Sequence, residues 1–381
     1  MMRMVAVLMV ISLVIASAAT ARAEEFETSA KFAYMLDVNT GAVLLDKGST
    51  ERMTPSSMTK LMTLYLLFDA MKKGSVTPET TFPVSERAWR MQGSKMFVQA
   101  GDSVAVKELI PGIIVQSGND ACVVVAEGIA GSQEAFADDM NAMAEKLGLK
   151  DSHFMNPDGW PDPKHYMTAH DLALLARHII EDFPEYYPHF KETDFTYNNI
   201  HQPNRNRLLY RNIGVDGLKT GHTEDGGYGI TASAVEDGRR IILVVNGLAT
   251  EKERIEEAER LLHHGFRDFT TVKLYKAGDP IEKAEVWMGT EKDVPLVTAE
   301  DIGYTASKRI GQKDTAEMSV TWQSPVVAPV HKGDKLAELT IKRNGEVFKT
   351  LPLVAGADVP RLSFFGRMKA IPLHYLSGKK E

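Results

Sequence analysis

The chain has 381 residues and a formal net charge of −7 at pH 7. This acidic balance, together with the lack of basic runs in the body of the chain, argues against a nucleic-acid-binding protein. Cys122 is the only cysteine, which excludes an internal disulfide. Its apolar, helix-like surroundings favour a buried, inert thiol over a nucleophile.

The N-terminal segment has the pattern of a secretory signal peptide. Arg3 precedes the apolar run VAVLMVISLVIASAA, and Ala21-Arg22-Ala23 supplies the small-x-small cleavage pattern. A membrane-spanning anchor is the alternative, but the run is short for a bilayer and no charged stop-transfer flank follows. We expect residues 1–23 to be removed after Ala23, which leaves about 358 residues of an exported protein, enough for roughly two domains.

Residues 24–271 are expected to form a first domain in which helices pack on one mixed sheet, an α/β (α+β) architecture. Its strands are expected in two hairpins, KFAYMLDVNTGAVLLDKG and GYGITASAVEDGRRIILVVNGL, and in GVDGLKTGHT. Its helices are expected at about 57–73 and in VKELIPGIIVQS, NDACVVVAEGIA, SQEAFADDMNAMAEKLGL, DLALLARHIIED and EKERIEEAERLLHHGF. The polar stretch NNIHQPNRNRLLYRN is expected to be a surface connection.

Residues 272–360 change character to short alternating strands with Gly, Pro and Asn-Gly turns. They predict a small all-β domain, a sandwich or a barrel. The basic tail, residues 361–381, would align Phe364, Met368, Ile371 and Tyr375 on one face of a helix, which suits peripheral contact with a membrane. A helix docked on the β domain or a frayed tail stays open, because Pro372 interrupts the helix and the apolar face is small.

The helix expected at 57–73 begins with a serine and a lysine three residues apart. Positions three apart share one face of a helix, so the Lys60 amine can reach the Ser57 hydroxyl. A serine needs a base to become nucleophilic, and a buried lysine with a depressed pKa is one. The alternative is a capping serine with a snorkelling lysine, and Ser377-Gly378-Lys379-Lys380 repeats the same spacing in the tail.

Two further polar motifs lie at expected element ends. Ser117-Gly118-Asn119 separates two apolar helical patterns, where a hydroxyl could pass a proton and an amide could hold a peptide group, although all three are also ordinary turn residues. Lys219-Thr220-Gly221-His222 lies in an expected strand. Its cation and hydroxyl could bind a carboxylate, Gly221 would admit a ligand backbone, and the His222 N–H could join that of Ser57 as an oxyanion hole.

Together the three motifs follow the order S-x-x-K, S-D-N-like and K-T-G that marks penicillin-binding proteins and class A β-lactamases. Ser57 and Ser117 are 60 residues apart, and Ser117 and Lys219 are 102 residues apart. The combination predicts serine acyl-transfer chemistry.

The stretches TPSSMTKLMT, LIPGIIVQSGNDACVVVAEGIAGS, NRNRLLYRN and VDGLKTGHTEDGGYGITASA resemble the low-molecular-mass penicillin-binding proteins that are serine-type D-Ala-D-Ala carboxypeptidases. The likeness runs from about Phe26 to Phe365, and S-G-N in place of S-D-N favours these carboxypeptidases over β-lactamases. The resemblance implies a transpeptidase/β-lactamase-like domain, a β-rich C-terminal domain and a C-terminal anchor in the periplasm, at the outer face of the inner membrane. The tail of this chain is shorter and less apolar than family anchors usually are.

Carried over by motif, the resemblance makes Ser57 the nucleophile and Lys60 the base, assisted by Ser117. It makes Asn119, Lys219, Thr220, Gly221 and His222 substrate-binding residues. It implies the D-Ala-D-Ala end of the peptidoglycan stem pentapeptide as substrate, β-lactam antibiotics as covalent inhibitors, and neither a metal nor another cofactor.

Other activities remain open on the sequence alone. A D,D-endopeptidase would use the same residues, and a non-catalytic penicillin-binding sensor would share the acylation step. A β-lactamase is disfavoured because no E-x-x-L-N pattern lies between Ser117 and Lys219. A zinc peptidase is disfavoured because His165, His170 and His178 occur without an H-E-x-x-H motif.

Overall fold

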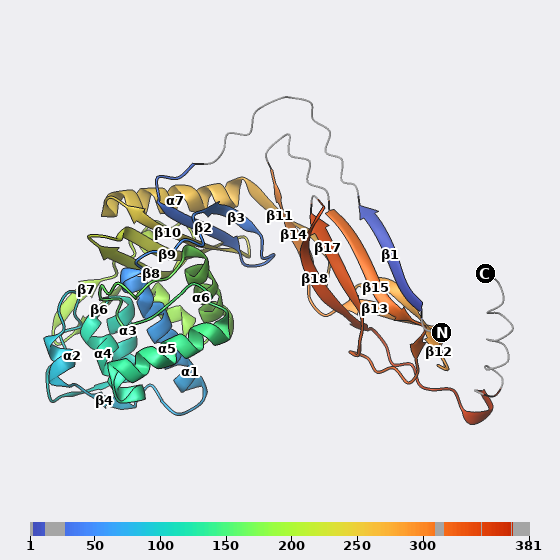
Figure 1. Cartoon of the computed structure of the whole chain (residues 1–381), viewed down its shortest axis with the longest axis horizontal. Helices are drawn as coiled ribbons and strands as arrows, with labels where there is room; N and C mark the ends of the chain where they lie inside the picture. Colours follow the sequence, from blue (N-terminus) through green and yellow to red (C-terminus); the bar gives the residue numbers. More distant parts are fainter. Residues whose placement is uncertain (1–2, 12–26, 309–315, 344, 367, 369–381) are drawn as a thin grey trace. The chain divides into compact units, whose positions relative to one another are not determined.

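The computed structural model describes residues 3–11, 27–308, 316–343, 345–366 and 368, and it divides into two compact units (Figure 1). One unit is Glu25–Arg267, and the other contains Asp268–Glu381 together with the N-terminal residues. The boundary between Arg267 and Asp268 lies close to the change of character in the sequence at residue 272.

The first unit is built on a five-stranded sheet in the order β3-β2-β10-β9-β8. The bounds are β2 Phe32–Asp37, β3 Val43–Lys47, β8 Val215–Thr223, β9 Gly227–Glu236 and β10 Arg239–Leu248. Both expected hairpins are confirmed, and all four neighbouring strand pairs are antiparallel rather than mixed in direction. Strand β8 lies at an edge of this sheet, so one side of its backbone is left for another partner.

Helices cover both faces of this sheet (Figure 1). Along β10, Ile241, Leu243 and Val245 pack in the apolar cluster that contains α7, whereas Ile242 and Val244 pack in the cluster of the other helices. The helices are α1 Lys60–Lys72, α2 Glu86–Arg90, α3 Val106–Ile114, α4 Asn119–Ala130, α5 Gln133–Leu147, α6 Ala169–Asp182 and α7 Glu251–Arg267. The alternation of side chains along a strand thus buries β10 on both faces.

Helix α1 is the central helix of the larger cluster. Its residues from Lys60 to Phe68 are all buried, so it has no polar outer face. Short elements connect the helices: β4 Thr81–Pro83, β5 Ser103–Ala105, β6 Asp194–Tyr197, β7 Ile200–Pro203, and the 3₁₀ turns η1 Ser56–Thr59, η2 Tyr187–Lys191 and η3 Arg207–Tyr210.

The second unit is all β, as its sequence predicts. A seven-stranded sheet has the order β1-β15-β17-β18-β13-β12-β16, and β11 pairs with β14. The bounds are β1 Arg3–Ile11, β11 Phe269–Tyr275, β12 Pro280–Trp287, β13 Asp293–Thr298, β14 Ile302–Ser307, β15 Ala316–Ser324, β16 Val326–Val327, β17 Lys335–Arg343 and β18 Glu346–Ala355. Alternate residues such as Val320 and Trp322 bury one apolar core.

The expected signal peptide is described only over Arg3–Ile11, where it forms β1. This strand pairs antiparallel with β15, with Arg3 opposite Ser324 and Ile11 opposite Ala316. The expected cleavage site at Ala23 lies outside the described residues. The signal peptide therefore stays a prediction, and its removal would take β1 out of the sheet.

The C-terminal tail is described only in part. Phe364, Phe365 and Met368 are exposed large apolar side chains, and the rest of the expected apolar stripe lies outside the described residues. Over the part of the chain that the structure describes, no helix has both the length and the apolar character needed to span a bilayer.

A buried ion pair joins the first unit's sheet to α7. The Arg239 Nε donates to Asp37 Oδ2 at 2.6 Å, and Arg239 Nη1 donates to the Gly265 carbonyl at 2.9 Å. The Asp37 side chain is fully buried and that of Arg239 is 10% exposed. The pair therefore ties the end of β2 to the start of β10 and to α7.

We predict that Arg239→Met destabilises the protein by about 3–5 kcal/mol, because it strands the buried Asp37 carboxylate. Urea unfolding followed by circular dichroism measures this free energy. Arg177→Met is the matched control, since the Arg177–Glu181 pair is exposed and should contribute at most about 0.5 kcal/mol. Equal effects of the two substitutions would contradict the prediction.

Candidate active site

The 3₁₀ turn η1 presents Ser57 at the entrance to α1. The sequence predicts an α-helix from about Ser57, but the α-helical bonding begins at Lys60 and Ser57 lies in η1. Pro55 precedes the turn, and the Met58 N–H donates to the Pro55 carbonyl at 3.1 Å. Ser57 is partly exposed while Lys60 is fully buried, so the hydroxyl faces outward above a buried amine.

Lys60 joins three segments of the chain. Its Nζ donates to Ser57 Oγ at 2.8 Å, to Asn119 Oδ1 at 2.8 Å and to the Asp158 carbonyl at 2.6 Å. The expected Ser57–Lys60 contact is confirmed, and the snorkelling alternative is wrong because the amine does not reach solvent.

The S-G-N motif lies between α3 and α4, as expected. Ser117 is buried and has a positive φ of 58°, and Asn119 is the first residue of α4. Both polar atoms of the Asn119 amide make hydrogen bonds. Its Oδ1 accepts from Lys60, and its Nδ2 donates to the Gln92 carbonyl at 2.7 Å. Asn119 therefore lies against Lys60, and Ser117 lies two residues before it.

Strand β8 carries the K-T-G motif past η1. Lys219 and Thr220 are buried, and His222 is exposed with its ring stacked on Tyr228 at 3.9 Å between centroids. A Cβ on Gly221 would lie 2.9 Å from the Pro55 carbonyl oxygen. The missing side chain thus makes room for η1, whereas the sequence suggested room for a ligand.

Burial shifts the pKa of both lysines at the site. Burial lowers the pKa of Lys60, with a further lowering by the Arg205 charge against opposing effects of Cys122, Asp158 and Asp120. Burial, then the charges of Lys60 and Arg205, hold the pKa of Lys219 well below its usual range. Both amines are therefore biased towards losing a proton.

Arg205 is a site residue that the motifs do not reveal. It lies in the stretch expected to be a surface connection, and most of that stretch is exposed, Arg205 included, although Asn204 and Asn206 are buried. Asn206 Oδ1 accepts from the Leu208 N–H and its Nδ2 donates to the Gly217 carbonyl of β8. The Arg205 guanidinium donates to Ser94 Oγ, and Arg254 of α7 donates to the Arg205 carbonyl at 3.4 Å.

A loop over residues 156–165 closes the site below Lys60. His165 is buried next to Thr59, with 2.9 Å between Nε2 and Oγ1, and its Nδ1 accepts from the Met155 N–H at 3.3 Å. Burial lowers the pKa of His165 to about 4, so the ring is neutral at pH 7. Gly159 packs so tightly that a Cβ there would lie 1.9 Å from the Ser56 carbonyl oxygen.

The histidines of the zinc-peptidase alternative are each engaged elsewhere. His170 contacts Asp171 and His178 contacts Asp182, while His165 contacts Thr59. Over the described residues, no three His, Cys, Asp or Glu side chains group in a way that could hold a metal ion.

A helix-and-sheet domain in which S-x-x-K, S-G-N and an edge-strand K-T-G motif converge defines a penicillin-recognising serine hydrolase. Family models agree with this class. Residues 17–250 match the D-alanyl-D-alanine carboxypeptidase family, and residues 269–361 match the C-terminal domain of penicillin-binding protein 5. The chain belongs to the D-alanyl-D-alanine carboxypeptidase family.

Individual relatives extend over nearly the whole chain. D-alanyl-D-alanine carboxypeptidase DacC of Escherichia coli (strain K12) is 39% identical over 342 residues, 88% of this chain and 85% of the relative. Penicillin binding protein 5 from Haemophilus influenzae has a similar structure, with a TM-score of 0.79, 36% identity, and coverage of 90% of this chain and 100% of that chain. Ampicillin-bound penicillin-binding protein D2 from Listeria monocytogenes matches with a TM-score of 0.59 and 26% identity over 64% of this chain and 99% of that chain.

We predict that Gly159→Ala lowers the rate of penicillin acylation by at least about tenfold, because the added Cβ would push the loop away from η1 and move the Asp158 carbonyl from Lys60. Intact mass spectrometry after timed exposure to penicillin measures the rate. Gly131→Ala is the matched control. It has nearly the same φ, 82° against 80°, but no atom lies within 4 Å of its Cβ. A comparable loss of rate in both variants would contradict the role of the close contact.

Proposed function

We propose that Ser57 is the nucleophile and Lys60 the general base of a serine-type D-Ala-D-Ala carboxypeptidase. The observation that carries this proposal is the 2.8 Å hydrogen bond between Lys60 Nζ and Ser57 Oγ, made by an amine that is fully buried. A neutral Lys60 can accept the Ser57 proton as the oxygen attacks a carbonyl carbon. Among the described residues, none of the three groups that accept from Lys60 is a carboxylate, and burial outweighs the opposing charges of Asp158 and Asp120 on its pKa.

The leaving D-Ala is oriented by its carboxylate. Lys219 and Thr220 on β8 bind this group in our proposal. The positive charge of Arg205 lies near enough to lower the pKa of both lysines, so it also favours a carboxylate there. The edge position of β8 allows an extended peptide to lie beside it. The backbone N–H groups of Ser57 and His222 then face the carbonyl oxygen as it becomes negative.

The reaction takes place in two steps. Ser57 Oγ attacks the carbonyl of the penultimate D-Ala, the peptide C–N bond breaks, and the terminal D-Ala leaves with a proton relayed by Lys60 and Ser117. Water then hydrolyses the ester to free Ser57 and the shortened peptide. The Asn119 amide, fixed between Lys60 and Gln92, positions the peptide on the acyl side. A β-lactam ring acylates Ser57 by the same attack, which is supported by the ampicillin-bound relative.

We propose that the site acts outside the cytoplasm, because the proposed substrate is a cell-wall peptide. We propose that residues 1–23 direct export to the periplasm and are removed, in line with their charge and apolar pattern. We propose further that the tail contacts the membrane surface, which is supported by the exposure of Phe364, Phe365 and Met368.

We predict that wild-type protein releases D-Ala from Nα,Nε-diacetyl-L-Lys-D-Ala-D-Ala, with no loss of rate in EDTA. Ser57→Ala should reduce the rate by at least about 10⁴-fold, since removing the nucleophile removes the covalent step. Release is measured with a D-amino-acid-oxidase assay, and loss of the penicillin adduct is measured by intact mass.

Ser377→Ala is the control, because Ser377 belongs to the second S-x-x-K copy in the chain. It should leave the rate unchanged. Full activity of Ser57→Ala, or a wild-type rate abolished by EDTA, would refute the serine mechanism. Rapid penicillin hydrolysis without an adduct would indicate a β-lactamase instead.

We also predict how acylation depends on pH. The folded pKa of Lys60 is below its ordinary value of 10.5, so the neutral base forms below that pH and the rate rises with pH to a plateau. Arg205→Gln removes a positive charge that lowers this pKa, so the midpoint of the rise should move to higher pH. Rates of penicillin acylation across pH 5–10.5 measure the midpoint.

Arg211→Gln is the matched control, since the Arg211 side chain is half exposed and faces Glu259 at 3.8 Å. Its profile should coincide with that of the wild type. A midpoint for Arg205→Gln that is unchanged or lower would contradict the prediction.

A further inference from the structure

Strand β8 contains an extra residue just before the K-T-G motif. Val215 lies opposite Ala234 of β9, and Gly217 lies opposite Ser233, the next residue of β9 in the antiparallel pair. Asp216 therefore has no partner of its own on β9 and forms a β-bulge. A bulge of this kind re-aims the side chains that follow it.

The bulge decides on which face of the sheet Lys219 lies. Val215 and Lys219 are four residues apart, so in a regular strand their side chains would share one face. Val215 packs in the apolar cluster that contains α7. Without the bulge, the register of Val215 would continue to place Lys219 opposite Ile230, which packs in that same cluster.

With the bulge, Lys219 lies opposite Thr231 instead. The Thr231 hydroxyl donates to Met58 Sδ at 3.5 Å, and Met58 belongs to η1, the turn that carries Ser57. Since a shift of one residue exchanges the two faces of a strand, the bulge brings the Lys219 amine to the side of Ser57 rather than into the apolar cluster of α7.

Four side chains hold the extra residue in place, and we call them the bulge clamp: Tyr187, Asp216, Ser233 and Arg240. The Asp216 carboxylate accepts from the Tyr187 hydroxyl at 2.6 Å and from Arg240 Nη1 at 2.9 Å. Arg240 Nη2 contacts the other carboxylate oxygen at 2.8 Å. Arg240 Nη1 also donates to Ser233 Oγ at 2.6 Å, so the bulged residue is tied to the strand opposite it.

The bulge clamp connects three neighbouring strands and η2. Asp216 lies on β8, Ser233 on β9, Arg240 on β10 and Tyr187 in η2. The Asp216 and Arg240 side chains are only 20% and 21% exposed, and the Arg240 guanidinium lies 5.1 Å from the centroid of the Tyr187 ring. A two-point pair between a guanidinium and a carboxylate fixes direction as well as distance.

The remaining contacts of Tyr187 close the arrangement from outside the sheet. Burial, and then the charge of Asp216, raises the pKa of Tyr187, so its hydroxyl stays protonated and donates to that carboxylate. A Cβ on Gly217 would lie 3.0 Å from the Tyr187 hydroxyl oxygen and 3.1 Å from Phe190 Cβ. Turn η2 therefore packs directly against the bulge.

We propose that Asp216 is a positioning residue: by holding the bulge, the clamp keeps Lys219 and Thr220 at the place where the terminal carboxylate of the substrate binds. The proposal deepens the proposed carboxypeptidase function and rests on it. Asp216 acts through the backbone of β8 and not by contact with the substrate.

Two peptides that differ only at the C-terminus test the proposal. Nα,Nε-diacetyl-L-Lys-D-Ala-D-Ala ends in a carboxylate, whereas its C-terminal amide carries no charge there. Both release Nα,Nε-diacetyl-L-Lys-D-Ala, and liquid chromatography of this common product gives kcat and KM for each peptide. We expect the wild type to show a kcat/KM at least about tenfold higher for the acid, because only the acid offers a charged group to the K-T-G motif.

Asp216→Ala should lower this acid-to-amide ratio at least about fivefold, chiefly by raising KM for the acid, because the groups that bind the carboxylate are no longer held in place. Arg240→Met should lower the ratio by a similar factor. The double variant should lose no more than either single variant, since the two side chains act as one unit. A smaller fraction of folded protein lowers both rates alike and leaves the ratio unchanged.

Tyr187→Phe is a milder variant that keeps the ion pair and removes one donor, and it should lower the ratio at least about twofold. Asp182→Ala is the matched control. Asp182 accepts from the Tyr65 hydroxyl at 2.8 Å and contacts His178 at 3.3 Å, so it is also a carboxylate between a tyrosine and a basic side chain, but it lies at the end of α6. Its ratio should equal that of the wild type.

A high wild-type ratio that stays unchanged in Asp216→Ala and Tyr187→Phe, or that falls equally in Asp182→Ala, would overturn the positioning role and leave the carboxypeptidase function intact. A wild-type ratio near one would overturn the carboxylate role of the K-T-G motif and this proposal with it. Failure to release the common product from either peptide would overturn the function itself.

Discussion

Burial of the Lys60 amine is the constraint around which the first unit is arranged. Removing an ammonium from water costs several kcal/mol, and the chain offsets this with acceptors from η1, from the first residue of α4 and from the Asp158 carbonyl. Because two of these acceptors lie 59 and 98 residues beyond Lys60, the amine can only be satisfied once the domain is assembled. The same desolvation that costs free energy favours the neutral amine, the form that a base requires.

The packing of α1 and β8 against η1 holds Ser57 next to the buried Lys60 amine. Helix α1 is buried from Lys60 to Phe68 because other helices enclose it, so its first residue lies in the interior of the unit. Strand β8 approaches η1 closely enough that Gly221 has no space for a side chain, and Ser56 Oγ donates to Thr223 Oγ1 at 3.1 Å across that junction. Ser57 is thus held between a buried base and an edge strand.

Much of this was predictable because its signals are local in the sequence. The Ser57–Lys60 contact spans one helical turn, and the two hairpins and the apolar periodicity of the longer helices are patterns within short windows. The change of character near residue 272 likewise marks the all-β unit. The 3₁₀ form of the turn at Ser57 was not predictable, since it depends on Pro55 and on the contact with β8 rather than on local propensity.

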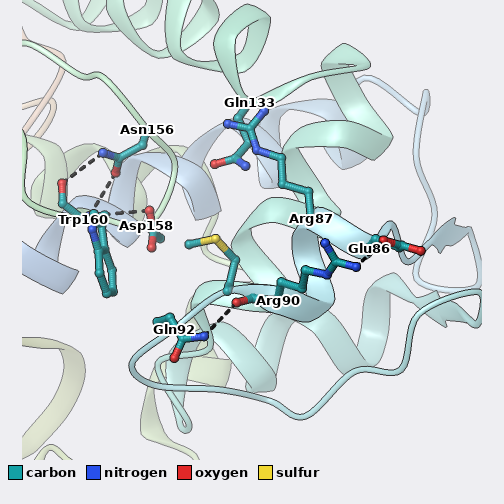
Figure 2. A pocket seen from close by; sticks show the side chains of 9 residues that line it. Glu86, Arg87, Arg90, Gln92, Gln133, Asn156, Asp158 and Trp160 are labelled. Atoms are coloured by element: carbon teal, nitrogen blue, oxygen red, sulfur yellow. Dashed lines mark hydrogen bonds and ion pairs between the residues drawn. The ribbon is translucent and has the colours of Figure 1, made fainter.

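The remaining site residues depend on distant contacts that no short window contains. Arg205 lies in an exposed polar stretch typical of a surface loop, and this stretch is held against β8 because Asn206 donates to the Gly217 carbonyl. Asp158 lies in a Pro- and Gly-rich segment. Its carbonyl accepts from Lys60, whereas its side-chain Oδ2 is buried without a hydrogen-bond partner among the described residues, and only the folded loop sets these two surroundings. The short helix α2 lines a cavity in front of Trp160 (Figure 2). It has too few residues to give a periodic signal in the sequence.

If residues 1–23 are removed as we propose, the pairing of β1 with β15 is present in the full-length chain and lost from the processed one. In the full-length chain nine register pairs cover the outer edge of β15. Proteolytic maturation after Ala23 would leave that edge with exposed amide and carbonyl groups, the state in which a strand recruits another chain. The inner face would be unchanged, since Met318, Val320 and Trp322 stay in the core. Processing would therefore expose the edge of β15 to other chains and leave the apolar core of the β domain unchanged.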